Sequence, residues 1–523
     1  MMRFWAESLV DSVSASSAAD QTRLADSILT PNLLFLSFNL LALVVMSFYS
    51  TARFRFSFSR AIILTTCLYA WAASSIEAQD QGDRVVVTAP FETKIGDKKV
   101  DAVYSGDIHT VLAVDGKWAA LDGVRGWVAR QNLMSLPSAK KFYEARIKKN
   151  VRDYDAIASL GMIQYEQGDY VAAFTQLNEA IKLNKNNAMI WNWRGIVLNA
   201  QQKYNAAIVD FTEALRINPK FAYAFHNRGL TRFEKGEFEE AIKDFDEAIK
   251  IEENRPEFYT HRGAAWHASG DEAKAITDFD KAISISKRTV DALIGKGNVL
   301  LGRSEYDAAN EQVAKALEID PKNAKAINLR GWVAYKQQRL DAAKTDLDEA
   351  IRLAPAFPVP YNNRGVLLVD QRQFEAAVKD FSKALELAPE TAIYHTNRGN
   401  ALFGKGDFKA AVADYSKAVE LTPDLTDALN GLAWFLATCP EASLRDPAKA
   451  EELAQKLVGL TKTEDWSYLD TLAASFAAAG KFEEAVKQQT RATELAPEGK
   501  QAVCAARKEL YQQQKPYVEG GPK

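Results

Sequence analysis

Small and apolar positions recur along residues 154–497 with a period of 34. Eight glycines stand 34 residues apart, from Gly161 to Gly399, and an alanine follows each of them after twelve residues. A second alanine comes seven residues later, from Ala180 to Ala418. Small residues at these spacings predict paired helices whose backbones approach closely, because larger side chains would hold the helices apart. The pattern therefore predicts a stack of two-helix units, each of which buries its apolar face against its neighbours.

Glycine and proline mark the ends of the predicted helices. In one unit, residues 222–236 read as the first helix and residues 238–251 as the second. A glycine in the left-handed conformation ends several first helices, and a proline stops several second helices. A large side chain 16 residues after the repeated glycine, called the plug residue below, is expected to fill the gap between units. The helix-ending glycines are Gly236, Gly270 and Gly406, the prolines are Pro219, Pro321, Pro355, Pro389 and Pro423, and the plug residues are Phe211, Phe245, Phe279, Leu347, Phe381 and Tyr415.

These residues resemble the tetratricopeptide repeat family, from about Tyr154 to Pro497. The resemblance implies a mainly α fold, an α-solenoid of about ten helix-turn-helix repeats over residues 154–497. Repeats 1 to 8 are numbered below by their glycines, called the repeat glycines. A polar stretch at residues 498–514 is expected to form a capping helix at the end of the stack.

The ninth repeat departs from the period, because its second helix begins about five residues late. Asp446 followed by Pro447 reads as an N-cap and first helical position, so a helix is expected to restart there. The extra segment is either a binding loop or a tolerated loop elongation, since surface insertions cost little. We favour elongation.

Two positions of the repeat change together. The residue before the repeat glycine is arginine in six repeats, and the same six repeats carry aspartate just before the plug residue. We interpret the two as facing each other across the helix pair in a half-buried, charge-assisted bond. The alternative is a basic strip for an anionic ligand. The six pairs are Arg194–Asp210, Arg228–Asp244, Arg262–Asp278, Arg330–Asp346, Arg364–Asp380 and Arg398–Asp414; repeats 1, 5 and 10 instead combine Leu160 with Gln176, Lys296 with Gln312, and Leu472 with Gln488.

The charge balance, the cysteine spacing and the motifs narrow the classes of function that the sequence predicts. The chain has 65 basic and 68 acidic side chains and a net charge of −3, which gives no drive toward nucleic acid. Cys67, Cys439 and Cys504 form neither a metal spacing nor a disulfide framework. The sequence contains no HExxH pattern, no glycine-rich phosphate loop after a strand and no nucleophile elbow. We therefore expect neither an enzyme nor a cofactor or metal.

The N-terminal region carries a targeting pattern. An apolar segment at residues 61–73 is preceded by Arg53, Arg55 and Arg60 and followed by small residues as far as Ala78. This order of basic region, short apolar core and small residues is typical of a secretory signal.

The start of the chain is open to two interpretations. In the first, Met46 is the initiator, residues 46–78 are the signal, and residues 1–45 are spurious upstream sequence. In the second, an apolar segment at residues 33–49 inserts into the membrane together with the signal segment as an anchoring hairpin. Both keep the arginines in the cytoplasm and carry the repeats across the membrane. The expected location is the periplasm or the outer side of the inner membrane, with or without a membrane anchor.

Residues 83–137 change to a period of two. Strands are expected at residues 84–88, 110–114, 117–121 and 126–129 and at a closing Leu133, with a hairpin turn at Asp115-Gly116. Gly106-Asp107, Trp118 and Gly126-Trp127-Val128 resemble the bacterial SH3 family, which implies a small β-barrel that binds peptides or cell-wall material. Trp118 and Trp127 either line a ligand groove of this SH3-like barrel or fill its core.

The leading functional hypothesis is an exported scaffold that binds peptides or protein partners on the concave face formed by the first helices. An amide offers both a donor and an acceptor, so asparagines two residues before the repeat glycine suggest a partial ladder to a peptide backbone. The alternative for these residues is a solvated polar helix face. The candidate contacts are Asn227, His261, Asn298, Asn363, Asn397, Asn400 and Phe403, extended by Phe233, Trp332 and Tyr335.

The runner-up function is an envelope-assembly subunit associated with the cell wall. In this hypothesis the SH3-like domain binds wall material or peptides, and the solenoid holds it at a distance. An enzyme whose site spans the barrel and the repeats is a third hypothesis, but no acid–base pair supports it.

Overall fold

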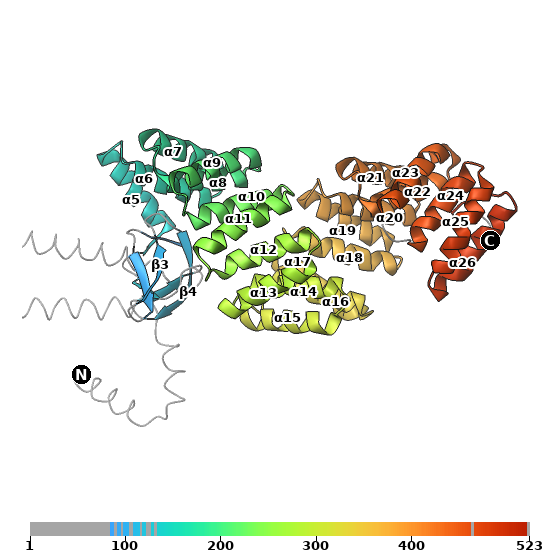
Figure 1. Ribbon diagram of the computed structural model, residues 1–523, viewed down its shortest axis with the longest axis horizontal. Coiled ribbons are helices and arrows are strands. Elements are labelled where there is room, and N and C mark those ends of the chain that lie inside the picture. Colours follow the sequence, from blue (N-terminus) through green and yellow to red (C-terminus); the bar gives the residue numbers. More distant parts are fainter. Residues whose placement is uncertain are drawn as a thin grey trace, which may run out of the picture. The chain divides into compact units, whose positions relative to one another are not determined.

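The computed structural model places the described chain in two compact units, which divide between Val151 and Arg152 (Figure 1). The predicted segments 1–45 and 46–78 lie outside the described residues. Those residues are 84–87, 91–95, 98–103, 108–115, 118–121, 127–129, 133–461 and 465–519.

The first unit contains an antiparallel sheet of five strands in the order β6-β5-β4-β1-β7. These strands overlap the five that the alternating pattern predicts, and Asp115 pairs with Trp118 on either side of the expected hairpin turn. No pairing is described between the outer strands β6 and β7, so the closed SH3-like barrel stays a prediction. The strands are β1 (Arg84–Val87), β4 (Ile108–Asp115), β5 (Trp118–Leu121), β6 (Trp127–Ala129) and β7 (Leu133–Ser135).

Three further elements of this unit were not predicted. Strands β2 (Phe91–Ile95) and β3 (Lys98–Val103) pair with each other in a separate two-stranded sheet. Both carry many charged residues, which hides their alternation. Helix α5 (Leu136–Lys149) follows β7, contacts β1 and β7, and buries Tyr143.

The second unit is a stack of helix pairs in chain order (Figure 1). Each first helix packs on its own second helix, which in turn packs on the next first helix. The first helices are α6 (Tyr154–Glu166), α8 (Ala188–Ala200), α10 (Ala222–Glu234), α12 (Pro256–Ala268), α14 (Val290–Gly302), α16 (Ala324–Lys336), α18 (Pro358–Asp370), α20 (Ala392–Lys405), α22 (Thr426–Thr438) and α24 (Trp466–Ala478). The second helices are α7 (Tyr170–Leu183), α9 (Tyr204–Ile217), α11 (Phe238–Ile251), α13 (Glu272–Ile285), α15 (Tyr306–Ile319), α17 (Leu340–Leu353), α19 (Phe374–Leu387), α21 (Phe408–Leu421), α23 (Pro447–Leu460) and α25 (Phe482–Leu495).

The repeat glycines allow the two helices of a pair to touch. A Cβ atom built on Gly195 would lie 2.6 Å from Cε1 of the plug residue Phe211, and one built on Gly365 would lie 2.6 Å from Cε1 of Phe381. Both plug side chains are buried. In the five repeats with an aromatic plug residue, the repeat glycine is therefore explained by the close contact between that ring and the backbone of the facing helix.

In repeats 1 to 8 and 10, the turn between the two helices contains one residue in the left-handed region. Gly236, Gly270 and Gly406 have φ between 85° and 89°, as their role in ending first helices predicts. Repeats without a glycine at this position put another residue into the same region, which costs a non-glycine residue free energy. These residues are Gln202, Ser304, Gln338 and Arg372, with φ between 58° and 61°.

Capping residues fix the start of the second helix of repeat 9. Asp446 caps α23 by accepting a hydrogen bond of 3.0 Å from the backbone N–H of Lys449, and Pro447 is the first residue of that helix. The extra segment before it contains a short 3₁₀ turn (Ala442–Leu444). Helix α26 (Glu498–Gln512) packs on α25.

Candidate interaction surface on the first helices

The first helices of neighbouring repeats contact one another directly, from α6 and α8 through α20 and α22. They therefore make one continuous surface. In repeats 2 to 8 the residue that follows the repeat glycine is accessible on this surface: Asn298 and Asn400 are exposed, and the others are half-buried. These others are Ile196, Leu230, Ala264, Trp332 and Val366.

At four of the seven junctions between repeats 1 to 8, the residue two before a repeat glycine hydrogen-bonds to the residue three before the preceding repeat glycine. We call such a pair a rung. Asn227 Nδ2 donates to Asn192 Oδ1 at 3.0 Å, and Asn397 Nδ2 donates to Asn362 Oδ1 at 2.8 Å. The predicted ligand-binding asparagines thus use part of their hydrogen-bonding capacity to join one repeat to the next.

Four asparagines form an unbroken chain across repeats 6 to 8. Asn397 donates to Asn362, Asn362 donates to Asn363 at 3.3 Å, and Asn363 donates to Asn328 at 3.0 Å. Asn363 is buried and has its amide oxygen and nitrogen both engaged. We therefore assign Asn363 to the rungs rather than to a peptide ligand, because its polar atoms already have partners inside the protein.

The sequence analysis missed one member of each rung. Asn192, Asn328 and Asn362 stand three residues before a repeat glycine and are buried. Asparagine recurs at both of these neighbouring positions, but the repeat pattern does not show that the two positions meet across repeats.

Two histidines form the rung between repeats 3 and 4. His226 Nε2 lies 2.8 Å from His261 Nδ1, so one imidazole donates and the other accepts. Burial lowers the pKa of His226 well below its usual value, and the neighbouring His261 lowers it further. Burial also lowers the pKa of His261. Both rings are therefore neutral at pH 7.

Aromatic side chains lie beside the accessible row. Trp332 stacks on Tyr335 with ring centroids 4.6 Å apart, and the Lys336 ammonium lies 5.4 Å from the Trp332 ring. Tyr335 Oη donates to Asp370 Oδ2 at 2.5 Å, which joins α16 to α18. Phe403 is half-buried and packs against Phe408 and Phe435.

Asn298 and Asn400 differ in what they still offer to a ligand. Asn400 accepts a hydrogen bond of 2.7 Å from Tyr415 Oη, although its side chain is exposed. Asn298 is exposed, and no hydrogen bond to another described residue engages its amide. Asn298 is therefore the exposed amide of the row with no partner among the described residues, and the half-buried Trp332 follows it in the next repeat.

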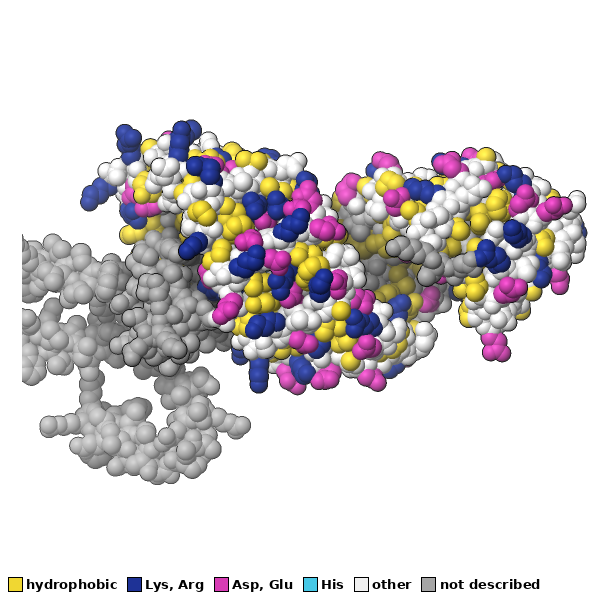
Figure 2. Space-filling view, in the orientation of Figure 1, with side chains coloured by type: hydrophobic (Ala, Val, Ile, Leu, Met, Phe, Trp, Pro, Cys, Tyr) yellow, Lys and Arg dark blue, Asp and Glu magenta, His cyan; other side chains and the backbone are white. Residues whose placement is uncertain are grey.

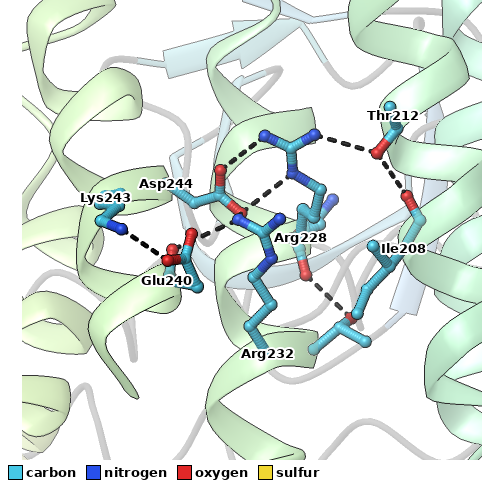
Figure 3. Close-up of polar contacts among 9 residues, drawn as sticks. Ile208, Thr212, Arg228, Arg232, Glu240, Lys243 and Asp244 are labelled. Atoms are coloured by element: carbon cyan, nitrogen blue, oxygen red, sulfur yellow. Dashed lines mark hydrogen bonds and ion pairs between the residues drawn. The ribbon is translucent and has the colours of Figure 1, made fainter. Parts of the chain in front are cut away.

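The six arginines that covary with aspartates each donate two hydrogen bonds to that aspartate, through Nε and Nη2, at 2.6–3.0 Å. Figure 3 shows this arrangement for Arg228 and Asp244, with Arg232 as a second donor to the same carboxylate at 2.8 Å. The hydrogen bonds to Asp380 raise the pKa of Arg364, and those to Asp278 contribute to the raised pKa of Arg262. These bonds join the two helices of each repeat, so Nε and Nη2 of these arginines are not free for a ligand.

A cavity of about 310 Å³ lies between repeats 9 and 10 and helix α26, where Trp434, Trp466 and Arg507 are among the lining residues. The Arg507 guanidinium lies 4.8 Å from the rings of both Trp434 and Tyr517 and pairs with Asp470. The backbone N–H of Glu519 donates to the Thr438 carbonyl at 2.8 Å. The segment after α26 thus folds back onto repeat 9.

The other candidate groups of the described chain are metal-ligating side chains, the cysteines and the surface charges. In the part of the chain that the structure describes, no group of three or more His, Cys, Asp or Glu side chains is placed to hold a metal ion. Cys439 and Cys504 are buried thiols, and burial raises the pKa of each. Basic and acidic side chains are interspersed over the visible face of the repeats (Figure 2).

The predicted SH3-like groove and the predicted signal segment are not part of the first-helix surface. Trp118 and Trp127 stand on neighbouring strands, where Trp118 pairs with Ala129 and Trp127 with Ala120. The SH3-like groove stays a prediction. Among the described helices, none has the length and apolar character needed to cross a membrane, and the predicted signal segment lies outside them.

Comparisons with known proteins agree with the repeat period. Residues 294–357 and 362–426 match one tetratricopeptide repeat family model, and residues 161–202, 197–236 and 229–270 match a second. No curated protein matches the chain.

Several solved structures resemble parts of the chain. A tetratricopeptide repeat protein from Parabacteroides merdae is 21% identical, with 50% of this chain and 99% of that chain covered and a TM-score of 0.43. Yeast Tom70 is 18% identical; the match covers 72% of this chain and 92% of Tom70, with a TM-score of 0.36. PilF of Pseudomonas aeruginosa is 20% identical; the match covers 40% of this chain and 97% of PilF, with a TM-score of 0.35.

Proposed function

Because residues 161–270 and 294–426 are tetratricopeptide repeats, an architecture of protein–protein interaction, we propose that the chain is an exported scaffold that binds an extended segment of a partner protein along its first helices. The observation that carries the proposal is the accessible row on these directly contacting helices. Asn298, Trp332, Val366 and Asn400 occupy it in four consecutive repeats.

The chemistry of this row suits a peptide better than a small molecule. Asn298 offers both an amide donor and an acceptor to a peptide backbone. Trp332, held by Tyr335, supplies a rigid apolar face beside the Lys336 cation. Each hydrogen bond nets only about 0.5–1.5 kcal/mol, so useful affinity requires contacts spread over several repeats.

The test compares co-purification with full-length variants from the native host. Asn298→Ala with Trp332→Ala removes the exposed amide and the large aromatic side chain of the row in consecutive repeats. Val171→Ala with Val209→Ala is the matched control, because these side chains are 75% and 65% exposed on second helices. Proteins retained by the wild type and by the control but lost from the first-helix variant, at an unchanged melting temperature, support the proposal. Equal retention by all three proteins refutes it.

Export rests on the sequence of residues 46–78. N-terminal sequencing of the protein from its native host should give a mature end between Ala73 and Asp80 if the signal is cleaved. An uncleaved anchor predicts a chain that begins at Met46 or Met1 and fractionates with the membrane. A soluble cytoplasmic protein with an intact Met1 contradicts export.

The second candidate function is binding to the cell wall through the N-terminal unit. The five antiparallel strands found where the SH3-like resemblance expects them favour it. Sedimentation of the full chain with purified wall material, lost on replacing Trp118 and Trp127 by alanine, would support this function. Retention that depends on Asn298 and Trp332 instead would support the scaffold alone.

A further inference from the structure

The arginines of the repeats make a third hydrogen bond that follows a strict rule. In five repeats, Nη1 of the arginine before the repeat glycine donates to the residue 16 positions earlier, on the second helix of the preceding repeat. Figure 3 shows it as the bond from Arg228 to Thr212. In repeat 5, Lys296 replaces the arginine and still reaches Asp280, 16 residues earlier, at 2.7 Å. The five arginine bonds join Arg194 to Asn178 (2.8 Å), Arg228 to Thr212 (3.0 Å), Arg262 to Asp246 (2.6 Å), Arg364 to Asp348 (2.6 Å) and Arg398 to Ser382 (3.3 Å).

Repeat 6 breaks this rule. The position 16 residues before Arg330 is Ala314, which has no side-chain acceptor. Arg330 keeps its two bonds to Asp346, at 2.9 and 2.7 Å, but Nη1 has no hydrogen-bond partner within the described residues. The Nη1 donor is hydrogen-bonded in each of the five other repeats that carry this arginine, and only Arg330 leaves it without a partner among the described residues.

Arg330 also lacks the aromatic cover that several of its counterparts have. Arg262 lies 5.5 Å from the ring of Tyr259, three residues earlier, and Arg364 lies 5.9 Å from the ring of Tyr361. The corresponding residue before Arg330 is Ile327. As a result the Arg330 side chain is 46% exposed, whereas the other five arginines are between 14% and 26% exposed.

A groove opens at this position. A cavity of about 530 Å³ lies between helix α15, helix α16 and the start of α17, and Arg330, Arg339 and Ala314 are among the residues that line it. Arg339 adds a second cation, and its Nη2 donates to Gln337 Oε1 at 2.6 Å. Glu318 is the one acidic residue among those that line the cavity.

We propose that this groove binds an aspartate or glutamate side chain of a partner protein, whose carboxylate accepts from Arg330 Nη1. The solenoid itself shows the geometry twice, because Asp246 fills this position for Arg262 and Asp348 fills it for Arg364. In both cases the guanidinium contacts two carboxylates, whereas Arg330 contacts only Asp346. A charge-assisted bond to a planar guanidinium is directional, so the partner's acid would be held in a defined orientation.

The decisive variant is Ala314→Asp in the full chain. It places a carboxylate where Asp246 and Asp348 stand relative to their arginines, and so fills the open edge from within. Ala314 is exposed and helical, so the fold should tolerate the change and the melting temperature should stay equal or rise. Val209→Asp is the matched control, because it adds the same charge at an exposed site on α9.

The probe is a fluorescein-labelled peptide of six glutamates, with binding followed by anisotropy at low ionic strength. We expect wild type and Val209→Asp to bind equally, and Ala314→Asp to bind at least tenfold more weakly. Arg330→Lys, which keeps the charge but loses the planar guanidinium, should also weaken binding. No measurable binding to wild type, or equal binding by wild type and Ala314→Asp, overturns the proposal. Neither Asn298 nor Trp332 lines this cavity, so failure of this proposal leaves the first-helix proposal untouched.

Discussion

His226 and His261 hydrogen-bond to each other between consecutive first helices, at the position where other repeats pair two asparagines. The contact is 2.8 Å long, and His226 is only 6% exposed. An amide pair and a neutral imidazole pair each supply one donor and one acceptor. Only the imidazole pair can take up a proton in the physiological range.

This rung predicts a pH dependence of stability. Burial lowers the pKa of both histidines in the folded protein below the 6.5 of the unfolded chain. Below pH 6.5 the unfolded state therefore binds more protons than the folded state, so the free energy of unfolding falls as the pH falls. The slope approaches about 1.4 kcal/mol per pH unit for each histidine that stays neutral when folded. Above pH 6.5 this contribution is constant.

The control copies a rung from elsewhere in the chain. His226→Asn with His261→Asn reproduces the pair formed by Asn192 and Asn227. Urea unfolding of both proteins between pH 5 and pH 7.5 should show the steeper loss only in the wild type. Parallel curves for the two proteins would mean that the histidines become protonated without opening the rung.

The bond between Arg364 and Asp380 predicts that removing one of the two residues lowers the free energy of unfolding strongly. Arg364→Ala leaves the Asp380 carboxylate, whose side chain is 9% exposed, without its bidentate partner. Breaking a buried pair typically costs about 3–5 kcal/mol, and we expect the lower end because Arg364 is 23% exposed. Chemical denaturation of the purified chain measures the loss.

A double substitution separates this pair from other effects. Arg364→Leu with Asp380→Gln copies the combination of Leu160 with Gln176 in repeat 1. It should recover most of the stability that Arg364→Ala loses, since no buried charge remains. Loss in the double variant equal to the sum of the single losses would show that the two residues are not energetically coupled.

The within-repeat contacts could be predicted from the sequence, whereas the between-repeat contacts could not. Arg364 and Asp380 stand 16 residues apart inside one repeat. Repeats that lack the arginine also lack the aspartate, so the contact is visible in the sequence as a correlation between the two positions. Asn397 and Asn362 stand 35 residues apart at two different repeat positions. Each resembles a solvated polar residue on its own helix, because the periodic pattern does not fix which positions of neighbouring first helices meet.

The same limit applies to the open edge of Arg330. The sequence predicts its bond to Asp346 but not the third bond, which connects an arginine to the preceding repeat. Ala314 is informative only once Asp246, Asp348 and their equivalents are known to bind Nη1. In the first unit, strands β2 and β3 escaped prediction because charged residues interrupt their apolar alternation.

The left-handed turns predict sites of stabilisation. Ser304 and Arg372 have φ of 61° and 58°, in a region that costs a non-glycine residue about 1–2 kcal/mol. Glycine removes this cost but loses about 0.5–1 kcal/mol of chain entropy on folding. Ser304→Gly with Arg372→Gly should therefore raise the melting temperature slightly. Gly236→Ala is the reverse control: φ is 85° and no atom lies within 4 Å of an added Cβ, so its loss of stability reports backbone conformation alone.

The close contact between Gly365 and Phe381 predicts that an added methyl group destabilises repeat 7. A Cβ atom on residue 365 would lie 2.6 Å from Phe381 Cε1, closer than any unstrained contact. Phe381 is fully buried and has no room to retreat. Overpacking of this kind costs about 1–3 kcal/mol, measured as a fall in the free energy of unfolding.

A second substitution tests whether the ring is the cause. Repeats 1 and 6 combine their repeat glycine with a leucine plug residue, and an added Cβ on Gly331 would lie 3.0 Å from Asp346 Cβ and 3.2 Å from Leu347 Cγ, farther than the 2.6 Å found at Gly365. Repeat 9 shows that alanine fits at the repeat-glycine position when no aromatic ring faces it, since Ala433 is fully buried there. Gly365→Ala with Phe381→Leu should therefore be more stable than the sum of the two single losses predicts. Strict additivity would place the steric conflict in the helix backbone rather than in the phenylalanine ring, because removing the ring would then bring no relief.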